Sequence, residues 1–168
     1  MSESFDVNGW KTPPLPEGKG GRVEWFRVEP GTTKVIRLLD AMPVTHPLHH
    51  FGRTPIVCWG NGCEPCQQGN PAQRYQFVRV LERTDERVKV FRMSVKVGGI
   101  LGEQVLAEHG NPTRYDIAVT RIGVGTKTTR YTFTKVGVET PVDLNGQRVP
   151  EWNEIFPPPK KNESKESE

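Results

Sequence analysis

In the middle of the chain, apolar and polar residues alternate along short runs. Alternation over about four to eight residues is typical of β-strands with one buried face. The pattern predicts six strands, at 23–28, 34–39, 75–83, 87–95, 115–122 and 128–136. Turn residues such as Glu29-Pro30-Gly31 separate these runs. Only residues 98–109 suit a helix, which Gly110 would end.

Five or six short strands and one short helix between strand pairs predict an all-β fold, mainly β with a single helix. The five-stranded oligonucleotide-binding barrel, or OB-fold, is the best-known architecture of this size. Strand spacing alone also allows an SH3-like barrel or a small sandwich. We expect an OB-fold-like five-stranded barrel over residues 21–156, with a metal-binding loop inserted at about 44–70.

The two ends of the chain differ from this middle part. Residues 1–20 are polar and rich in Pro and Gly, which is typical of a flexible N-terminal arm. Residues 157–168 are three prolines followed only by Lys, Asn, Ser and Glu. Such a segment has nothing to bury, so we expect a disordered C-terminal tail.

Composition narrows the class of protein. The 17 Gly and 15 Pro make up almost a fifth of the 168 residues, which argues against a helical bundle. No apolar run approaches the roughly 18 residues of a membrane-spanning helix. The first ten residues lack the apolar segment of a secretion signal. We therefore expect a cytoplasmic protein with no membrane partner.

The distribution of charge tells more than the net charge of +3. Residues 21–137 carry 17 Lys and Arg against 10 Asp and Glu, whereas residues 138–168 carry 4 against 7. A basic centre suits a protein that meets a polyanion such as a nucleic acid, although runs of charge also occur on ordinary solvated faces.

All three cysteines lie within nine residues, at Cys58, Cys63 and Cys66. The Cys63-Glu64-Pro65-Cys66 unit places two thiolates two residues apart on a tight turn, as in zinc knuckles. Two other hypotheses are a redox dithiol and three unrelated buried thiols. The first expects a strand before and a helix after the motif, and the glycine-rich loop and third cysteine do not fit it. The pattern favours structural zinc.

A fourth ligand is expected from the histidines His46, His49 and His50 just upstream. In a strand-like run over 44–51, His46 and His50 share one face and His49 lies on the other. If the following turn is centred on Arg53, Cys58 shares the face of His46. We therefore expect zinc on His46, Cys58, Cys63 and Cys66, with His50 and His49 as alternatives. Four protein ligands leave no open position, so we do not expect an enzyme.

Aromatic and basic residues alternate along three of the expected strands. Rings that stack on unpaired bases and cations that hold phosphates are what a single-strand binder needs. The alternative is that these rings fill the core, which we expect for Phe77 and Phe133. From this pattern we expect Tyr115 and Tyr131 to stack on bases and Arg79 to be one of the cations. We also expect stacking by Trp59, because it lies in a polar, glycine-rich loop where burial is harder.

The order Val35-Ile36-Arg37-Leu38-Leu39, Val44-Thr45-His46, Cys58 and Cys63-Glu64-Pro65-Cys66 resembles the single-stranded DNA-binding (helix-destabilising) proteins of T-even-type phages. The resemblance spans roughly residues 34–133. It implies an OB-fold, a structural zinc ion on His46 and the three cysteines, and a protein that coats single-stranded DNA during phage replication, recombination or repair. It also implies that the protein is located in the cytoplasm of an infected bacterium.

A second segment, 115–131, is similar to a motif of shorter phage relatives, in which a strand ending in T-R-x-G-x-G leads to a T-R-Y strand. This similarity implies DNA contacts by Arg121, Lys127, Arg130 and Tyr131. The chain departs from the T-even family at both ends. Residues 1–20 hold only Lys11 and Lys19, and the tail is near neutral instead of strongly acidic. The resemblance implies that the tail recruits replication or recombination proteins, but a near-neutral tail supports this expectation less than an acidic one would.

Two other functions fit the same residues. A zinc-ribbon module of the replication or transcription machinery would use the cysteine cluster as a scaffold for protein contacts and would not bind DNA itself. An RNA-binding OB-fold would differ by a 2′-hydroxyl contact, for which the sequence offers no signature.

Overall fold

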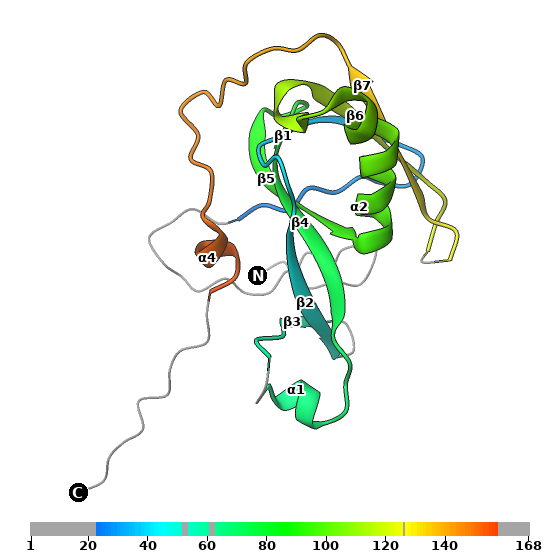
Figure 1. Cartoon of the computed structure of the whole chain (residues 1–168), viewed down its shortest axis with the longest axis vertical. Coiled ribbons are helices and arrows are strands. Elements are labelled where there is room, and N and C mark those ends of the chain that lie inside the picture. The colour runs from blue at the N-terminus through cyan, green and yellow to red at the C-terminus, as the bar shows by residue number, and fades with distance from the viewer. Residues whose placement is uncertain (1–22, 52–53, 61–62, 126, 158–168) are drawn as a thin grey trace, which may run out of the picture.

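The computed structural model describes residues 23–157 except 52, 53, 61, 62 and 126, and only the backbone of Phe51 and Thr54 (Figure 1). The expected N-terminal arm and the tail beyond residue 157 lie outside the described residues. The elements are β1 (Thr33–Leu38), β2 (Val44–Phe51), β3 (Thr54–Val57), α1 (Glu64–Gln67), β4 (Gln73–Glu82), β5 (Arg87–Ser94), α2 (Val95–Leu101), the π-helical turn η1 (Gly102–Leu106), α3 (Ala107–His109), the 3-10 turn η2 (Pro112–Arg114), β6 (Asp116–Ile122), β7 (Arg130–Val136) and α4 (Trp152–Ile155).

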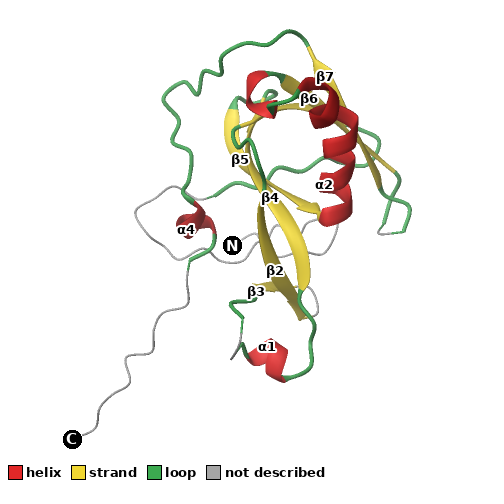
Figure 2. Ribbon diagram, viewed as in Figure 1, coloured by secondary structure: helices red, strands yellow, loops and turns green. Residues whose placement is uncertain are grey.

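The seven strands form one antiparallel sheet around the long strand β4 (Figure 2). One edge of β4 pairs first with β2, from Gln73 to Phe77, and then with β1, from Val80 to Glu82. The other edge pairs with β5 along its length. The sheet continues from β1 to β6 and β7, and from β2 to β3. Strand β4 thus joins a body, built on β1, β5, β6 and β7, to a projecting β2–β3 hairpin.

The prediction of a mainly β protein is confirmed, whereas a closed five-stranded barrel is not observed. Within the described part of the chain no ladder joins β5 to β7, so the sheet stays open there. The helical segment formed by α2, η1 and α3 lies beside this opening (Figure 2). Its Gln104 Oε1 accepts the Phe133 N–H of the edge strand β7 at 2.8 Å.

The main hydrophobic cluster, here the inner cluster, lies between the sheet and the helical segment. Side chains alternate along a strand, so one face of each strand supplies it. From β4 these residues are Val78 and Val80, and from the helical segment they are Leu101 and Val105. At Gly98 of the helical segment a Cβ atom would lie 1.7 Å from Gln76 Oε1, so a larger residue there would require the Gln76 side chain to move.

A second cluster, here the outer cluster, covers the opposite face of β4 and β5. Phe77 and Val90 come from the sheet, and Val23, Ile155 and Phe156 come from far ends of the described chain. Residues 137–150 cross from β7 to α4 as an extended segment (Figure 1). The outer face is therefore partly covered by the chain's own C-terminal segment, which the sequence pattern did not predict.

The run 23–28 was predicted to be a strand, and it is not. Only one parallel bridge, Trp25 to Val90, joins it to β5. The two hydrogen bonds of this bridge run from the Phe26 N–H to the Val90 carbonyl and from the Val90 N–H to the Glu24 carbonyl, both at 2.8 Å. The segment still delivers Phe26 and Val28 to the inner cluster and Val23 to the outer one.

Candidate metal centre and nucleic-acid face

The three cysteines lie on a compact loop that follows strand β3. Cys58 comes directly after β3, and its N–H donates to the Pro47 carbonyl of β2 at 2.9 Å. Cys63 precedes the single turn of α1, and Cys66 lies within that turn. Pro65 fixes the first turn of α1, where its missing N–H costs nothing. The turn therefore brings the two thiols of the Cys63–Cys66 pair to one side.

Four side chains converge at this loop. One ligand atom each from His49, Cys58, Cys63 and Cys66 lies within 4.8 Å of the others. The Cys66 Sγ lies 3.3 Å from His49 Nε2 and 3.5 Å from Cys58 Sγ. His49 is fully buried, whereas Cys66 is exposed. Three thiols and an imidazole at this separation form a group that could hold a metal ion.

The pKa values of two thiols in this group are shifted in opposite directions. A hydrogen bond from the Gly60 backbone lowers the pKa of the Cys58 thiol to about 7. The hydrogen bond between Cys66 and Cys58 raises the pKa of the Cys66 thiol to about 11. The protein alone thus favours one thiolate near neutral pH and opposes a second beside it. A cation would remove this conflict, because metals bind the thiolate form.

The histidine in this group is His49 and not the expected His46. The expectation placed Arg53 at the centre of the β2–β3 turn, so that Cys58 would lie opposite Leu48. In the structure Leu48 pairs with Val57, and Cys58 lies opposite Pro47. A shift of one residue moves a side chain to the other face of a strand. Cys58 therefore shares the face of His49.

His46 and His50 lie on the opposite face of β2 from the metal group. The His46 ring packs at 4.3 Å from the Phe156 ring and 6.1 Å from the Trp59 ring, measured between centroids. His50 Nε2 lies 3.1 Å from the Tyr75 hydroxyl. Burial lowers the pKa of both imidazoles. Strand β2 thus separates the metal group on one face from an aromatic surface on the other.

Two residues that were expected to contact nucleic acid are buried instead. Tyr115 is 0% exposed, and its hydroxyl donates to the Gly110 carbonyl at 2.9 Å. Arg121 is 5% exposed and donates to the Val28 carbonyl at 3.2 Å. Arg121 lies on the face of β6 that supplies Ile117 and Val119 to the inner cluster, and Tyr115, just before β6, is itself a member of that cluster. The alternating residues of this segment therefore face the core, and the basic residue at its end, Arg121, is buried with them.

Arg79 and Tyr131 are also engaged within the protein. The Arg79 guanidinium pairs with Asp40 at 2.5 Å, donates to the Pro150 carbonyl at 3.1 Å and lies 4.9 Å from the Trp152 ring. Its hydrogen bonds with Asp40 raise the pKa of Arg79. Tyr131 is half-buried against the inner cluster, with its ring stacked near that of Phe133. The C-terminal segment holds Arg79 in place.

Three of the expected contact residues face solvent. Trp59 is 44% exposed beside the cysteine loop. Lys127 and Arg130 are exposed on the β6–β7 hairpin. They are the most exposed members of the expected set.

The structure also assembles a group that sequence reasoning missed. His50, Tyr75 and Arg92 come together on the face shared by β2, β4 and β5, next to the part that α4 covers. The Arg92 guanidinium lies 5.4 Å from the Tyr75 ring centroid. Tyr75 pairs with His46 on one side and Ser94 on the other. This register depends on tertiary pairing, and the sequence carried no signal for it.

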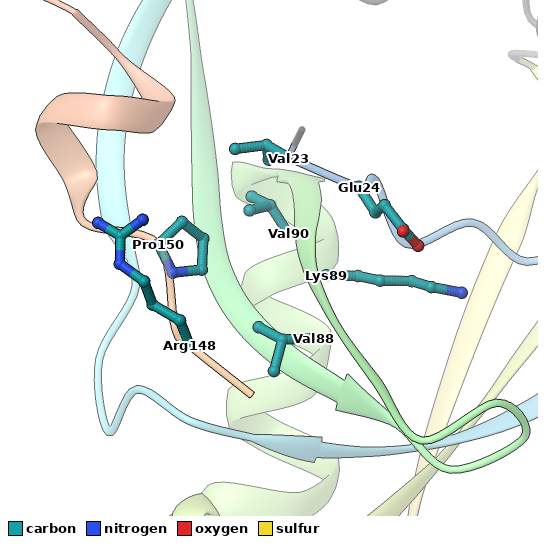
Figure 3. Close-up of a pocket in the computed structure, with 7 residues that line it drawn as sticks. All are labelled: Val23, Glu24, Val88, Lys89, Val90, Arg148 and Pro150. Carbon is teal, nitrogen blue, oxygen red and sulfur yellow. The ribbon is translucent and has the colours of Figure 1, made fainter. Parts of the chain in front are cut away.

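A small cavity of about 140 Å³ lies between residues 23–24, β5 and residues 148–150 (Figure 3). The charged groups on its walls have partners, because Arg148 pairs with Glu154 at 2.5 Å, Lys89 with Glu82 at 2.5 Å, and Glu24 with Arg87. The cavity thus offers a ligand no unpaired charge among the residues that line it.

Comparison of the chain with models of protein families, with curated proteins and with solved structures finds no match. The resemblance to phage single-stranded DNA-binding proteins thus stays a prediction. No helix in the described part of the chain is long and apolar enough to cross a membrane.

Proposed function

We propose that this protein binds single-stranded DNA without sequence preference and is not an enzyme. The observation that carries the proposal is the group of His50, Tyr75 and Arg92. Trp59 lies nearby, with its ring 6.1 Å from that of His46, which pairs with Tyr75. Together these residues combine half-exposed rings with a cation on one side of the sheet. Rings of this kind stack on unpaired bases of any sequence, and cations follow the phosphates.

The strand pairings support an OB-type interpretation of the sheet. Strands β1, β4, β5, β6 and β7 would be the five strands of a partly open barrel, with the helical segment between the third and fourth. OB-folds bind oligonucleotides on the face of strands 2 and 3 and with the loops that join strands 1–2 and 4–5. In this numbering the face is that of β4 and β5, the first loop holds the cysteines, and the second is the β6–β7 hairpin.

Zinc is the metal that the four ligands favour. Three thiolates and one imidazole are typical of tetrahedral structural zinc sites, whereas Mg²⁺ and Ca²⁺ prefer oxygen ligands. With His49, Cys58, Cys63 and Cys66 all bound, the ion would have no open position for chemistry. It would fix the loop that carries Trp59, and so hold that ring at the edge of the proposed DNA face.

The test is a fluorescence-anisotropy titration with labelled single-stranded and duplex DNA at about 50 mM and 200 mM salt, a range over which phosphate-contacting proteins lose much of their affinity. We expect salt-sensitive binding to the single strand. Trp59→Ala and Tyr75→Ala should each weaken it by about 5- to 150-fold, the value of one stacked base. Arg92→Gln should reduce the salt slope by about one.

Tyr115→Phe is the matched control, because this tyrosine is buried and should not touch DNA. Its affinity should equal that of the wild type. Absence of single-strand binding at the lower salt concentration would overturn the proposal and favour the protein-interaction module. Equal effects of Tyr75→Ala and Tyr115→Phe would remove Tyr75 from the proposed face. A preference for RNA over DNA of the same sequence would replace the ligand.

A further inference from the structure

The tip of the β6–β7 hairpin carries exposed apolar side chains between cations. Ile122 is 52% exposed and Val124 is 76% exposed. Lys127 and Arg130 are exposed on the returning side. From residue 117 to residue 138 the sequence has no acidic residue. The tip therefore combines an apolar end with positive charge, and the acidic residue of the hairpin, Asp116, lies at the far end of β6, where it pairs with Arg37 and Arg83.

The described part of the tip is held in shape by its own backbone. Gly123 has φ +85°, and a Cβ atom there would lie 2.2 Å from the Thr128 carbonyl oxygen. The Thr128 hydroxyl donates to the Val124 carbonyl at 2.5 Å, and the Thr129 N–H donates to the Gly125 carbonyl at 3.2 Å. Ile122 pairs with Arg130 in the β6–β7 register. These contacts fix the backbone that carries Ile122 and Val124.

Exposed aliphatic groups next to cations fit a partner whose apolar surfaces lie close to phosphates. The end of a DNA duplex is such a partner, since the faces of the terminal base pair are apolar and the flanking backbone is anionic. Aliphatic side chains such as Ile and Leu are known to insert between base steps and unstack them. The described tip offers no aromatic ring for a membrane interface and no acidic group for a basic protein surface.

We propose that the β6–β7 hairpin tip is a wedge that holds open the terminal base pair where a duplex meets a single strand. Ile122 and Val124 insert against the bases, while Lys127 and Arg130 hold the phosphates on either side. This inference rests on the proposed binding of single-stranded DNA and adds a second contact, with a junction as its ligand. It assigns the apolar residues a role that binding to a plain single strand does not require.

The test uses a duplex with a single-stranded extension and 2-aminopurine in the last base pair, whose fluorescence rises on unstacking. A second probe carries 2-aminopurine in the middle of an all-single-stranded oligonucleotide. We expect the wild-type protein to raise the junction signal. Ile122→Thr/Val124→Thr, which keeps β-branched shape, should lose at least two thirds of that rise. Its affinity for the single strand should stay within about twofold of the wild type.

Val138→Thr is the matched control, because Val138 is 77% exposed outside the hairpin tip. It should keep the full junction signal, and circular dichroism should show all variants folded. Lys127→Gln/Arg130→Gln should weaken the junction complex and flatten its salt dependence. If the double threonine variant opens the junction as well as the wild type, or if the wild type binds the single strand without a junction signal, the wedge is wrong and the proposed function stands. If the wild type binds neither DNA, both fail.

Discussion

The body of the sheet and the cysteine loop are stabilised in different ways. The inner cluster gathers 14 buried residues from strands β1, β4, β5, β6 and β7, the helical segment and nearby loops. Among the described residues between 55 and 72, only Pro55 and Pro65 are buried. A segment this small cannot remove enough apolar surface from water to fix itself. A metal ion held by the four clustered side chains would therefore do for the loop what apolar packing does for the body.

The largest effect should come from the body. Ile117 is fully buried in the inner cluster, so Ile117→Ala should lower the free energy of unfolding by about 2–5 kcal/mol, because it leaves a cavity. Urea denaturation measures this change. Ile122→Ala on the same strand is the control, since an exposed side chain should cost no more than about 0.5 kcal/mol. Metal content should not change in either variant, and a loss of metal with Ile117→Ala would show that the two regions are not separate.

The second test perturbs the cysteine loop and should leave the body of the sheet folded. His49→Ala removes one of the four clustered groups, so zinc affinity should fall by more than the roughly 100-fold that loss of an outer hydrogen-bond partner costs. Competition with a chromophoric chelator measures it. Hydrogen exchange should then speed up over residues 54–70 and stay slow in β4, β5 and β6. His46→Ala is the control, and equal zinc loss in both variants would contradict the assignment of His49.

A third test compares two glycines of the β6–β7 hairpin, which belongs to the body. Gly123 and Gly125 both have positive φ, so an alanine at either position pays about 1–2 kcal/mol of backbone strain. Only at Gly123 would the added Cβ also meet a backbone oxygen, that of Thr128. Gly123→Ala should therefore destabilise the protein clearly more than Gly125→Ala in thermal unfolding, without zinc loss. Equal melting temperatures would mean that the tip relaxes freely.

The smallest effect concerns α4, which closes the outer cluster with polar contacts at its start. The hydrogen bond from Arg148, at 2.5 Å, lowers the pKa of the Glu154 carboxyl. A carboxyl with a lowered folded-state pKa stabilises the fold above its unfolded pKa, and this contribution disappears as the pH falls through the folded value. Glu154→Gln should thus be slightly less stable than the wild type at pH 7, and the difference should shrink as the pH falls below the unfolded pKa of about 4.3. A constant difference across urea titrations would contradict this.

Much of the fold could be predicted from the alternation of side chains. Five of the six expected strands are present with ends that shift by no more than two residues, and the helical segment covers the expected range and begins three residues earlier. Local patterns decide these elements, because each strand buries one face. The run 23–28 has the same alternation and still forms only one bridge to β5, because strand pairing is decided by tertiary packing and not by the local pattern.

The site was harder to predict, because it depends on which residues face one another. The cysteines were found from their spacing alone, whereas the histidine depended on the register of one short hairpin. The same limit explains why Tyr115 was expected to contact nucleic acid and Tyr75 was not. Both lie on strands with alternating rings and cations, and only the packing of β6 against the helical segment separates them. The outer cluster had one local signal that sequence reasoning did not use. Ile155 and Phe156 lie three and four residues after Trp152, which is the spacing of one helix face.

The buried Arg37 has a consequence for where this domain ends. Its guanidinium is fully enclosed, donating to Asp116 at 2.8 Å, to the Thr140 carbonyl at 2.7 Å and to the Thr140 hydroxyl at 3.0 Å. A chain cut after β7 would remove both acceptors on Thr140 and open this buried cation to water. We therefore expect a fragment that stops at Val136 to be less stable than one that runs past Thr140, because the crossing after β7 supplies hydrogen-bond acceptors to the body of the sheet.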